Sequence, residues 1–246
     1  MNCYRTFVGL LSCAALACAL STPLQAGLIL NGGFESGLSN WTAVDQLGSA
    51  GTFFVQTGTS TPDTMSIVPP PPQGTQAAMT DAQGPGSHVL YQDFVVPSVV
   101  PGALINFMLL INNQSDRFAI PEPDNHLDFS TPALNQQARV DIMRVTPDPF
   151  SLSTADVLMD LYQTEVGDPL ATGYNAFVFD ITPLLQAHAG ETLRLRFAET
   201  DNVGPFNFGV DAVDVNVTAG AVPEPSMFVP AGVSILILGL TLKRRK

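Results

Sequence analysis

The stretch that indicates the fold class lies near the end of the chain and reads Phe208-Gly209-Val210-Asp211-Ala212-Val213-Asp214-Val215-Asn216-Val217. Aromatic and β-branched side chains alternate in it with small or polar ones. A period of two is typical of a β-strand with one buried face. We expect this segment to be the last strand of an all-β domain.

Earlier segments carry the same signal: His88–Val96, Leu104–Ile111, Ala138–Val145 and Thr192–Glu199. Leu104–Ile111 is almost continuously apolar, which suits a central strand. In the last two, apolar residues are expected to face inward and charged residues to face solvent. Because Pro- and Gly-rich stretches such as 69–72 and 84–86 separate these strands, the pattern predicts an antiparallel β-sandwich.

Helix is scarce in this pattern. Thr182–Ala189 is compatible with one or two helical turns that end at Gly190. Asp156–Tyr162 fits either a helix or a strand.

The first strand region narrows the type of sandwich. Residues 28–37, Leu-Ile-Leu-Asn-Gly-Gly-Phe-Glu-Ser-Gly, precede Trp41. This segment, together with Phe208–Val213, resembles the opening and closing strands of galactose-binding-like jelly rolls, a fold shared by many carbohydrate-binding modules. The resemblance implies that the first and last strands lie close together. It also implies a structural Ca²⁺ held by Glu35 and Asp211, with backbone carbonyls near Asn31. The alternative is that Glu35 only caps a turn.

Two other features bear on ligand binding. Trp41 follows the opening motif directly, which favours a place in the core over a sugar-stacking role. The polar loop Asn112–Asp128 is the better ligand candidate, because its amides, arginine and carboxylates suit a hydroxyl-rich ligand. Its candidate ligand-binding residues are Asn113, Asp116, Arg117 and His126. The alternative is a solvated connecting loop.

Catalysis has little support. His88, His126 and His188 are far apart in sequence without metal-type spacing, and we expect them to be isolated surface residues. No nucleophile elbow, phosphate loop or dinucleotide fingerprint occurs. We expect no enzyme activity, although counting carboxylates does not exclude a glycosidase pair.

Charge is strongly one-sided between the two ends of the chain. The segment from Glu35 to Glu224 contains 22 acidic residues but only five arginines, so its formal charge is −17. Such a field repels nucleic acid and anionic membranes, and it favours divalent cations or neutral glycans. Solubility alone would also explain it.

The N-terminus has the layout of an export signal. Arg5 precedes the uncharged apolar run Phe7–Leu20, and Ala26 closes a short polar region. Residues 1–26 are therefore predicted to be a signal peptide, with a lipoprotein signal as the alternative. All three cysteines lie in it, so a mature chain has neither disulfides nor thiolate metal sites.

The C-terminus combines Val222-Pro223-Glu224-Pro225, an apolar stretch at 227–242 and the basic tail Lys243–Lys246. A helix of 16 residues spans about 24 Å, slightly less than a bilayer core. The basic tail should stay in the cytoplasm, and the rest should be exported. An ordinary tail anchor is the plain alternative.

These three parts, in this order, resemble the PEP-CTERM sorting signal. The resemblance implies processing near Pro223, Glu224 and Pro225 by an exosortase-type membrane protease, in bacteria that make exopolysaccharide. It divides the chain into a signal peptide (1–26), an ectodomain (27–219), a linker (220–226), a transmembrane helix (227–242) and a basic tail (243–246). The membrane would hold the protein until processing, before its display on the surface or in the matrix.

The sequence is compatible with two functions. One is a non-enzymatic structural or adhesive role in the polysaccharide layer. The other is a glycan-binding module with a defined carbohydrate ligand.

Overall fold

A computed structural model of the protein describes residues 26–63 and 65–218. The predicted signal peptide up to residue 25, the motif Pro223-Glu224-Pro225, the apolar stretch 227–242 and the basic tail lie outside the described residues. Within the described ranges, no helix has the length and apolar character needed to cross a membrane.

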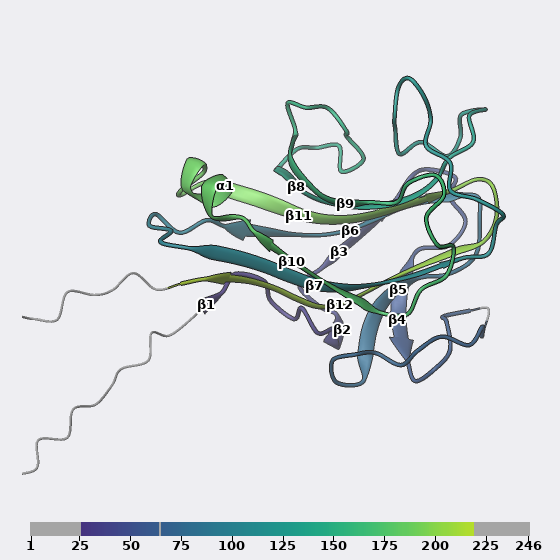
Figure 1. Ribbon diagram of the computed structural model, residues 1–246, viewed down its shortest axis with the longest axis horizontal. Helices are drawn as coiled ribbons and strands as arrows, with labels where there is room; N and C mark the ends of the chain where they lie inside the picture. Colours follow the sequence, from purple (N-terminus) through teal and green to yellow (C-terminus); the bar gives the residue numbers. More distant parts are fainter. Residues whose placement is uncertain (1–25, 64, 219–246) are drawn as a thin grey trace, which may run out of the picture.

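Two antiparallel sheets stack face to face (Figure 1). The first has the order β10 (Asn175–Asp180), β7 (Ala103–Asn113), β12 (Phe206–Val217), β5 (Gln76–Thr80) and β4 (Phe53–Thr57), with β1 (Ala26–Gly27) also paired to β12. The second has the order β3 (Thr42–Asp45), β6 (Gly86–Val95), β11 (Thr192–Asp201), β8 (Gln136–Arg144) and β9 (Val157–Gln163). The predicted all-β sandwich is confirmed.

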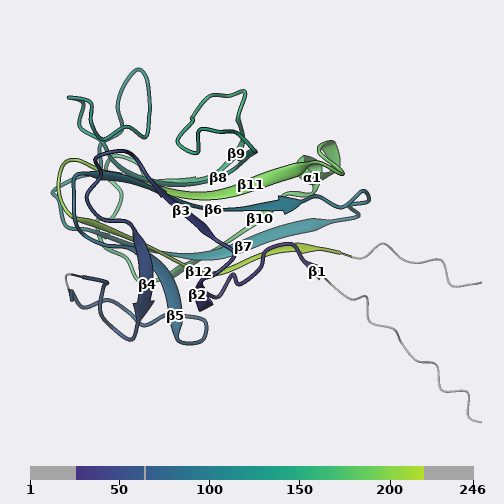
Figure 2. The ribbon, with the colours of Figure 1, turned by 180° about the vertical axis from the view of Figure 1, so that it is seen from behind.

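The strands and the helix lie close to where the sequence predicts them. All five predicted strands form, and β7 lies inside its sheet between β10 and β12, as a central strand should. The ambiguous segment from Asp156 is strand β9, and the predicted helical turns are α1 (Thr182–Ala187). β1 pairs with β12, so the first and last described strands are neighbours. Short β2 (Glu35–Leu38) leads into β3 (Figure 2).

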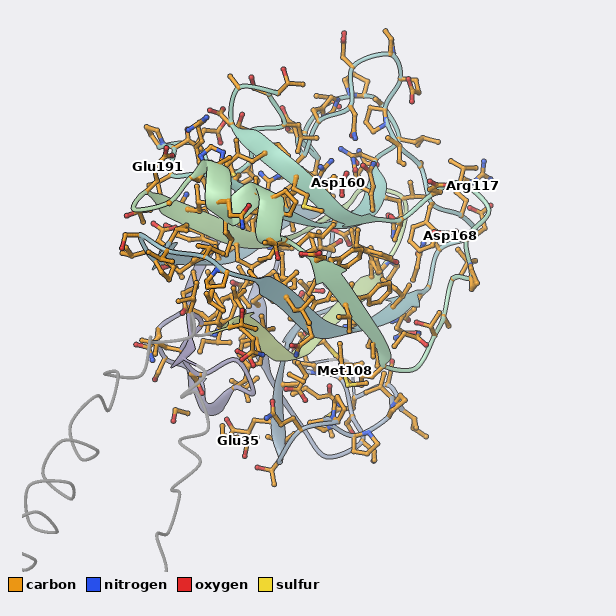
Figure 3. The ribbon with its side chains drawn as sticks, turned by 60° about the vertical axis from the view of Figure 1, so that its left-hand side comes forward. Glu35, Met108, Arg117, Asp160, Asp168 and Glu191 are labelled. Atoms are coloured by element: carbon orange, nitrogen blue, oxygen red, sulfur yellow. The ribbon has the colours of Figure 1, made fainter. Side chains whose placement is uncertain are left out.

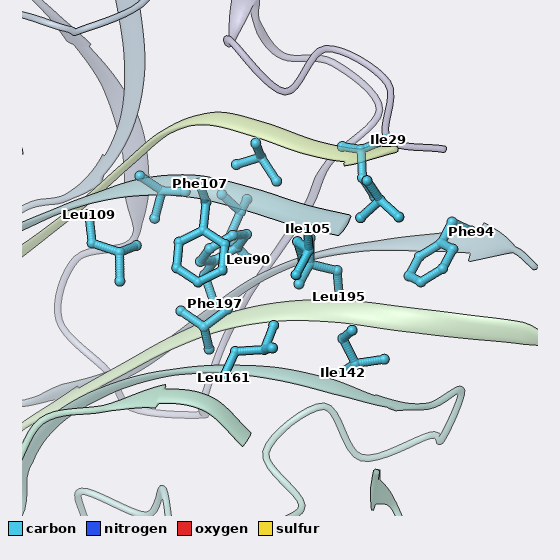
Figure 4. Close-up of a cluster of buried hydrophobic side chains, with 14 of the residues drawn as sticks. Ile29, Leu90, Phe94, Ile105, Phe107, Leu109, Ile142, Leu161, Leu195 and Phe197 are labelled. Carbon is cyan, nitrogen blue, oxygen red and sulfur yellow. The ribbon is translucent and has the colours of Figure 1, made fainter. Parts of the chain in front are cut away.

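The core lies between the sheets. Leu195 and Phe197 of β11 face Ile105 and Phe107 of β7, and all four are fully or almost fully buried (Figure 4). Burying a side chain of this kind stabilises the fold by about 1.5–3 kcal/mol. The row of apolar residues on β11 therefore joins the two sheets.

Trp41 belongs to this core. It is 7% exposed, and its ring centroid lies 5.3 Å from that of Phe34 and 5.9 Å from that of Phe197. Its indole Nε1 donates a hydrogen bond to the Asn31 carbonyl at 3.1 Å, which satisfies the polar atom of a buried ring. The predicted core role of Trp41 is confirmed.

One expectation about the second sheet is wrong. Arg139 and Asp141 of β8 and Arg194 and Arg196 of β11 do point away from the core, but all four are 5% exposed or less. Glu199 of β11, which was also expected to face solvent, is buried on the inner face. Loops on either side of β8 cover the four outer residues, and Figure 1 shows these loops beyond β8 and β9. The alternation correctly predicts that these four side chains lie on the outer face of the sheet. Because loops cover that face, the side chains contact protein instead of solvent.

Candidate functional site

The outer face of the five-stranded sheet carries a buried ion network. The Asp141 carboxylate, fully buried, accepts hydrogen bonds from Arg139 at 2.5 and 2.9 Å and from Arg196 Nε at 3.0 Å. One carboxylate thus joins guanidinium groups from two neighbouring strands. Such a network is stable only when every member is hydrogen-bonded, because buried unpaired charge is costly.

This network holds the loop 146–156 against the sheet. Arg196 Nη1 donates to the carbonyls of Pro149 and Ser151 at 2.7 and 2.8 Å. Arg194 Nη1 donates to the Thr146 carbonyl at 3.2 Å, while its guanidinium lies 3.7 Å over the ring of Tyr91. Because two arginines fix three backbone carbonyls, the loop has a defined position.

Side-chain amides hold the second covering loop, which contains residues 123–135. Gln137 Nε2 donates to Asn125 Oδ1 at 2.9 Å, and Asn135 Nδ2 donates to the His126 carbonyl at 2.8 Å. Gln46 Nε2 donates to Asp128 Oδ1 at 2.6 Å. Hydrogen bonds from Ser130 and Gln46 lower the pKa of Asp128, so this carboxylate is charged at neutral pH.

A groove of about 860 Å³ runs between the two loops. Its lining combines carboxylates, amides, hydroxyls and apolar side chains, chiefly Asp124, Asn125, Asp128 and Asp148 with Phe150 and Leu152. Phe150 is only partly buried, so part of its surface is open to a ligand. A concave surface with an aromatic side chain and several hydrogen-bonding groups is suited to a small polar ligand.

Only one of the four predicted ligand-binding residues lies in this groove. His126 lines it. Asn113 is buried and fixes its own turn, since its Oδ1 accepts hydrogen bonds from Ser115 and Gln136. Asp116 and Arg117 are exposed and pair with each other, and Figure 3 places Arg117 at the edge of the molecule. The loop Asn112–Asp128 therefore does not form one site.

The groove also contains residues that the sequence did not suggest. Gln46 comes from the segment after β3, and Asp148 and Phe150 come from the loop after β8. These segments are far apart in sequence and lie in irregular structure without periodicity. One sequence feature pointed to this region, namely the charged residues that alternate along β8 and β11. In the structure, the arginines of β11 hold loop 146–156 in place.

Comparisons with known proteins show no family for this chain. No family model and no curated protein matches the chain. Solved structures similar to it include TmCBM61 in complex with β-1,4-galactotriose (12% identity, TM-score 0.45, 77% of this chain and 97% of that one) and the K3 cleaved adhesin domain of Lys-gingipain from Porphyromonas gingivalis W83 (15%, 0.45, 80% and 99%).

A third is the enzymatically active domain of tailspike protein 4 of bacteriophage CBA120 (12%, TM-score 0.42, 78% of this chain). The chain spans only 21% of the length of that protein. At this identity, none of the three shows what this chain binds or does.

The predicted calcium residues converge on one loop. Glu35 Oε1 accepts hydrogen bonds from the backbone N–H groups of Thr75 and Gln76, both at 2.8 Å. Asp211 Oδ2 accepts one from the Gln73 N–H at 2.8 Å. Figure 3 shows Glu35 at the surface, whereas Asp211 is fully buried. Two carboxylates from opposite ends of the described chain thus hold the same four-residue segment.

Electrostatics shows that these two carboxylates interact. Burial raises the pKa of Asp211 to about 6, and the negative charge of Glu35 adds to that rise. Hydrogen bonds from Thr75 and Gln76 lower the pKa of Glu35. A hard cation bound to both carboxylates would offset this repulsion and would use the remaining oxygen lone pairs. The same hydrogen bonds to Thr75 and Gln76 also agree with the alternative, in which Glu35 caps a turn.

The three histidines lie in three different environments. His188 Nδ1 lies 2.9 Å from Glu191 at the surface. His126 lines the groove. His88 is 1% exposed, so the expectation that it is a surface residue is wrong. Its position on β6 places it on the inner face of the sandwich, in register with Glu199.

Proposed function

We propose that this chain is a non-enzymatic glycan-binding module, exported and displayed outside the cell, whose ligand site is the groove between loops 123–135 and 146–156. The observation that carries the proposal is the groove itself, in which Phe150 lies among amides and carboxylates. The apolar face of a sugar ring packs on an aromatic side chain, while its hydroxyls bond to polar groups.

Rigidity supports the same site. The arginines of β11 bind the carbonyls of one loop, and amides bind the other. Groups already held in place lose little entropy when a ligand binds, which favours weak polar ligands such as sugars.

Charge limits the kind of glycan. Asp124, Asp128 and Asp148 line the groove, and no arginine or lysine does. An acidic polysaccharide would meet like charges there, so the proposed ligand is a neutral or amino-substituted glycan.

Display rests on the two ends of the chain. The export signal and the PEP-CTERM-like tail support secretion and processing by an exosortase-type protease. An exopolysaccharide would be the natural partner of a groove that takes neutral sugars. A Ca²⁺ ion at Glu35 and Asp211 would be structural, because it would join the first and last strand regions of a cysteine-free jelly roll.

A glycan-array screen of the purified full-length chain tests the proposal. We expect reproducible binding to one neutral or amino-sugar class, competed by the free sugar. Phe150→Ala should reduce it about 2–13-fold, since one lost aromatic contact is worth about 0.5–1.5 kcal/mol. Phe54→Ala is the matched control, because Phe54 is an exposed phenylalanine on β4 in the other sheet.

Two results would count against the proposal. Binding that Phe150→Ala leaves unchanged would move the site elsewhere. Absence of binding across the array would favour the second candidate, a structural or adhesive role in the matrix. Cleavage of a bound glycan, detected by product analysis, would contradict the non-enzymatic part.

A further inference from the structure

On the inner face of β11, the side chains change from apolar to acidic towards the C-terminal end of the strand. Leu193, Leu195 and Phe197 point into the core at every second position, and Glu199 and Asp201 continue that row. In the neighbouring strand β6, His88 lies opposite Glu199, and Gly86 lies opposite Asp201. Two carboxylates and an imidazole therefore lie together at one end of the sandwich interior.

These three side chains are buried without enough partners. His88, Glu199 and Asp201 are 1%, 1% and 2% exposed. His88 Nε2, Glu199 Oε1 and Asp201 Oδ1 make no hydrogen bond within the described part of the chain. One ligand atom from each of the three residues lies within 4.8 Å of the others. A buried polar atom without a partner costs roughly as much as a lost hydrogen bond, and an unpaired charge costs more.

The histidine is oriented as a metal ligand would be. Its Nδ1 lies 2.7 Å from Asp45 Oδ1, and a carboxylate there accepts the Nδ1 proton. Nε2 then carries the free lone pair and faces the cluster. Histidine ligands usually donate their other ring N–H to a carboxylate or carbonyl in this way, which fixes the tautomer and the ring orientation.

Two glycines let the side chains of His88 and Asp201 pack close against the backbone. A Cβ at Gly86 would lie 2.3 Å from His88 Nε2, and a Cβ at Gly84 would lie 2.3 Å from Asp201 Oδ2. Asp201 also lines a cavity of about 430 Å³ together with Ala82–Pro85 and Asn202–Pro205. The cluster is thus deep but connected to a surface cavity through Asp201.

A further carboxylate adds to the local negative charge. Asp81 accepts hydrogen bonds from the Thr52 and Gln83 N–H groups and lies near the cluster. Burial raises the pKa of Glu199 well above its ordinary value and that of Asp201 to about 8, and neighbouring carboxylates contribute to both. Carboxylates this close together repel one another unless a proton or a cation lies between them.

We propose that His88 Nε2 and the carboxylates of Glu199 and Asp201 bind one divalent transition-metal ion of the Zn²⁺ type, with Asp45 as the positioning residue for His88. The imidazole decides the metal class, because nitrogen ligands suit Zn²⁺ and its neighbours, whereas Ca²⁺ and Mg²⁺ prefer oxygen alone. Three protein ligands leave a fourth position for water or a small ligand. None of these residues belongs to the groove or to the Glu35–Asp211 pair.

Zinc titration of the full chain, stripped of metal with a chelator, tests the site. We expect one Zn²⁺ per chain by calorimetry and elemental analysis, and a higher unfolding midpoint with zinc than without. Ca²⁺ should not displace the zinc. Glu199→Gln and His88→Gln should each weaken zinc binding at least about 100-fold, and Asp45→Asn should weaken it about 10–100-fold. His188→Gln is the matched control, since this surface histidine also has a carboxylate partner.

The stability of a variant without metal separates loss of the metal site from failure to fold. Without metal, Glu199→Gln should unfold no earlier than the native chain, because a neutral amide replaces a buried carboxylate that lacks a partner. The absence of tight zinc binding by the native chain would overturn the proposal. Zinc binding that persists in Glu199→Gln or disappears in His188→Gln would overturn it as well.

Discussion

Replacing Asp141 with asparagine should destabilise the protein strongly. Asp141 is fully buried and accepts hydrogen bonds from Arg139 and Arg196, which are 5% and 0% exposed. The change leaves the buried Arg196 guanidinium without a carboxylate partner, and it leaves Arg139 with Asp160 alone, at 3.1 Å. Removing one partner of a buried ion pair costs about 3–5 kcal/mol. Proteins have total stabilities of about 5–15 kcal/mol, so this is a large fraction.

Chemical and thermal unfolding of the full chain measure the effect. For a domain of this size, each kcal/mol shifts Tm by about 2–4 °C, so Tm should fall by about 6–20 °C. Hydrogen exchange should also become faster in loop 146–156, because Arg196 loses the carboxylate that orients it toward Pro149 and Ser151.

A matched control is available in the same protein. Asp116 pairs with Arg117 through the same chemistry, but both side chains are more than half exposed. Asp116→Asn should leave the unfolding midpoint unchanged within measurement, as most surface ion pairs do. A midpoint for Asp141→Asn as high as that of Asp116→Asn would refute the view that a buried network holds the groove in place.

Three further predictions concern the calcium pair and the chain ends. Ca²⁺ at a hundredfold excess over its dissociation constant should stabilise the native chain by about 2.7 kcal/mol against a chelator control. Glu35→Gln or Asp211→Asn should remove most of that gain. Equal unfolding midpoints with and without Ca²⁺ would exclude the ion. In chelator, the raised pKa of Asp211 means that the folded state binds the proton more tightly, so this group's contribution to stability should fall as pH rises from 3.8 to about 6. Asp211→Asn should flatten the pH dependence of the unfolding free energy in that window, and an unchanged slope would contradict the assignment. Mass spectrometry of protein extracted from the cell surface should find an N-terminus near Gly27 and no Lys243–Lys246 tail; an intact tail would contradict the proposed sorting.

The strands were predictable because their signals are local. The alternation around Val210 and Leu195 depends only on which face of a strand is buried, and both residues are in the core. Trp41 was placed correctly because its motif fixes its position next to the first strand region. The family resemblance implied that Glu35 and Asp211 share a Ca²⁺ ion, but it did not indicate loop 73–76, from whose N–H groups both carboxylates accept hydrogen bonds.

The environment of the charged residues was not predictable in the same way. Alternation places Asp141 and Arg196 on the outer face, but whether that face meets water depends on the path of irregular loops. The groove has the same origin, because Gln46, Asp128 and Phe150 meet only after the loops have folded over the sheet.

The acidic cluster was not predicted, because the charged residues of Thr192–Glu199 were expected to face solvent. Glu199 has the same parity as Leu193, Leu195 and Phe197, so the strand pattern itself places it on the inner face. A carboxylate in phase with an apolar row indicates either a strand end or a paired buried site. His88 completes the group only through the register of β6 with β11, which the sequence does not state.

The most direct test of the glycan-binding claim is hydrogen exchange of the full chain with and without the sugar selected by the array. We expect slower exchange in segments 123–128 and 148–154, which line the groove. Slower exchange confined to the turn around Asn113 and Arg117, or to the segment around Glu35, would contradict it.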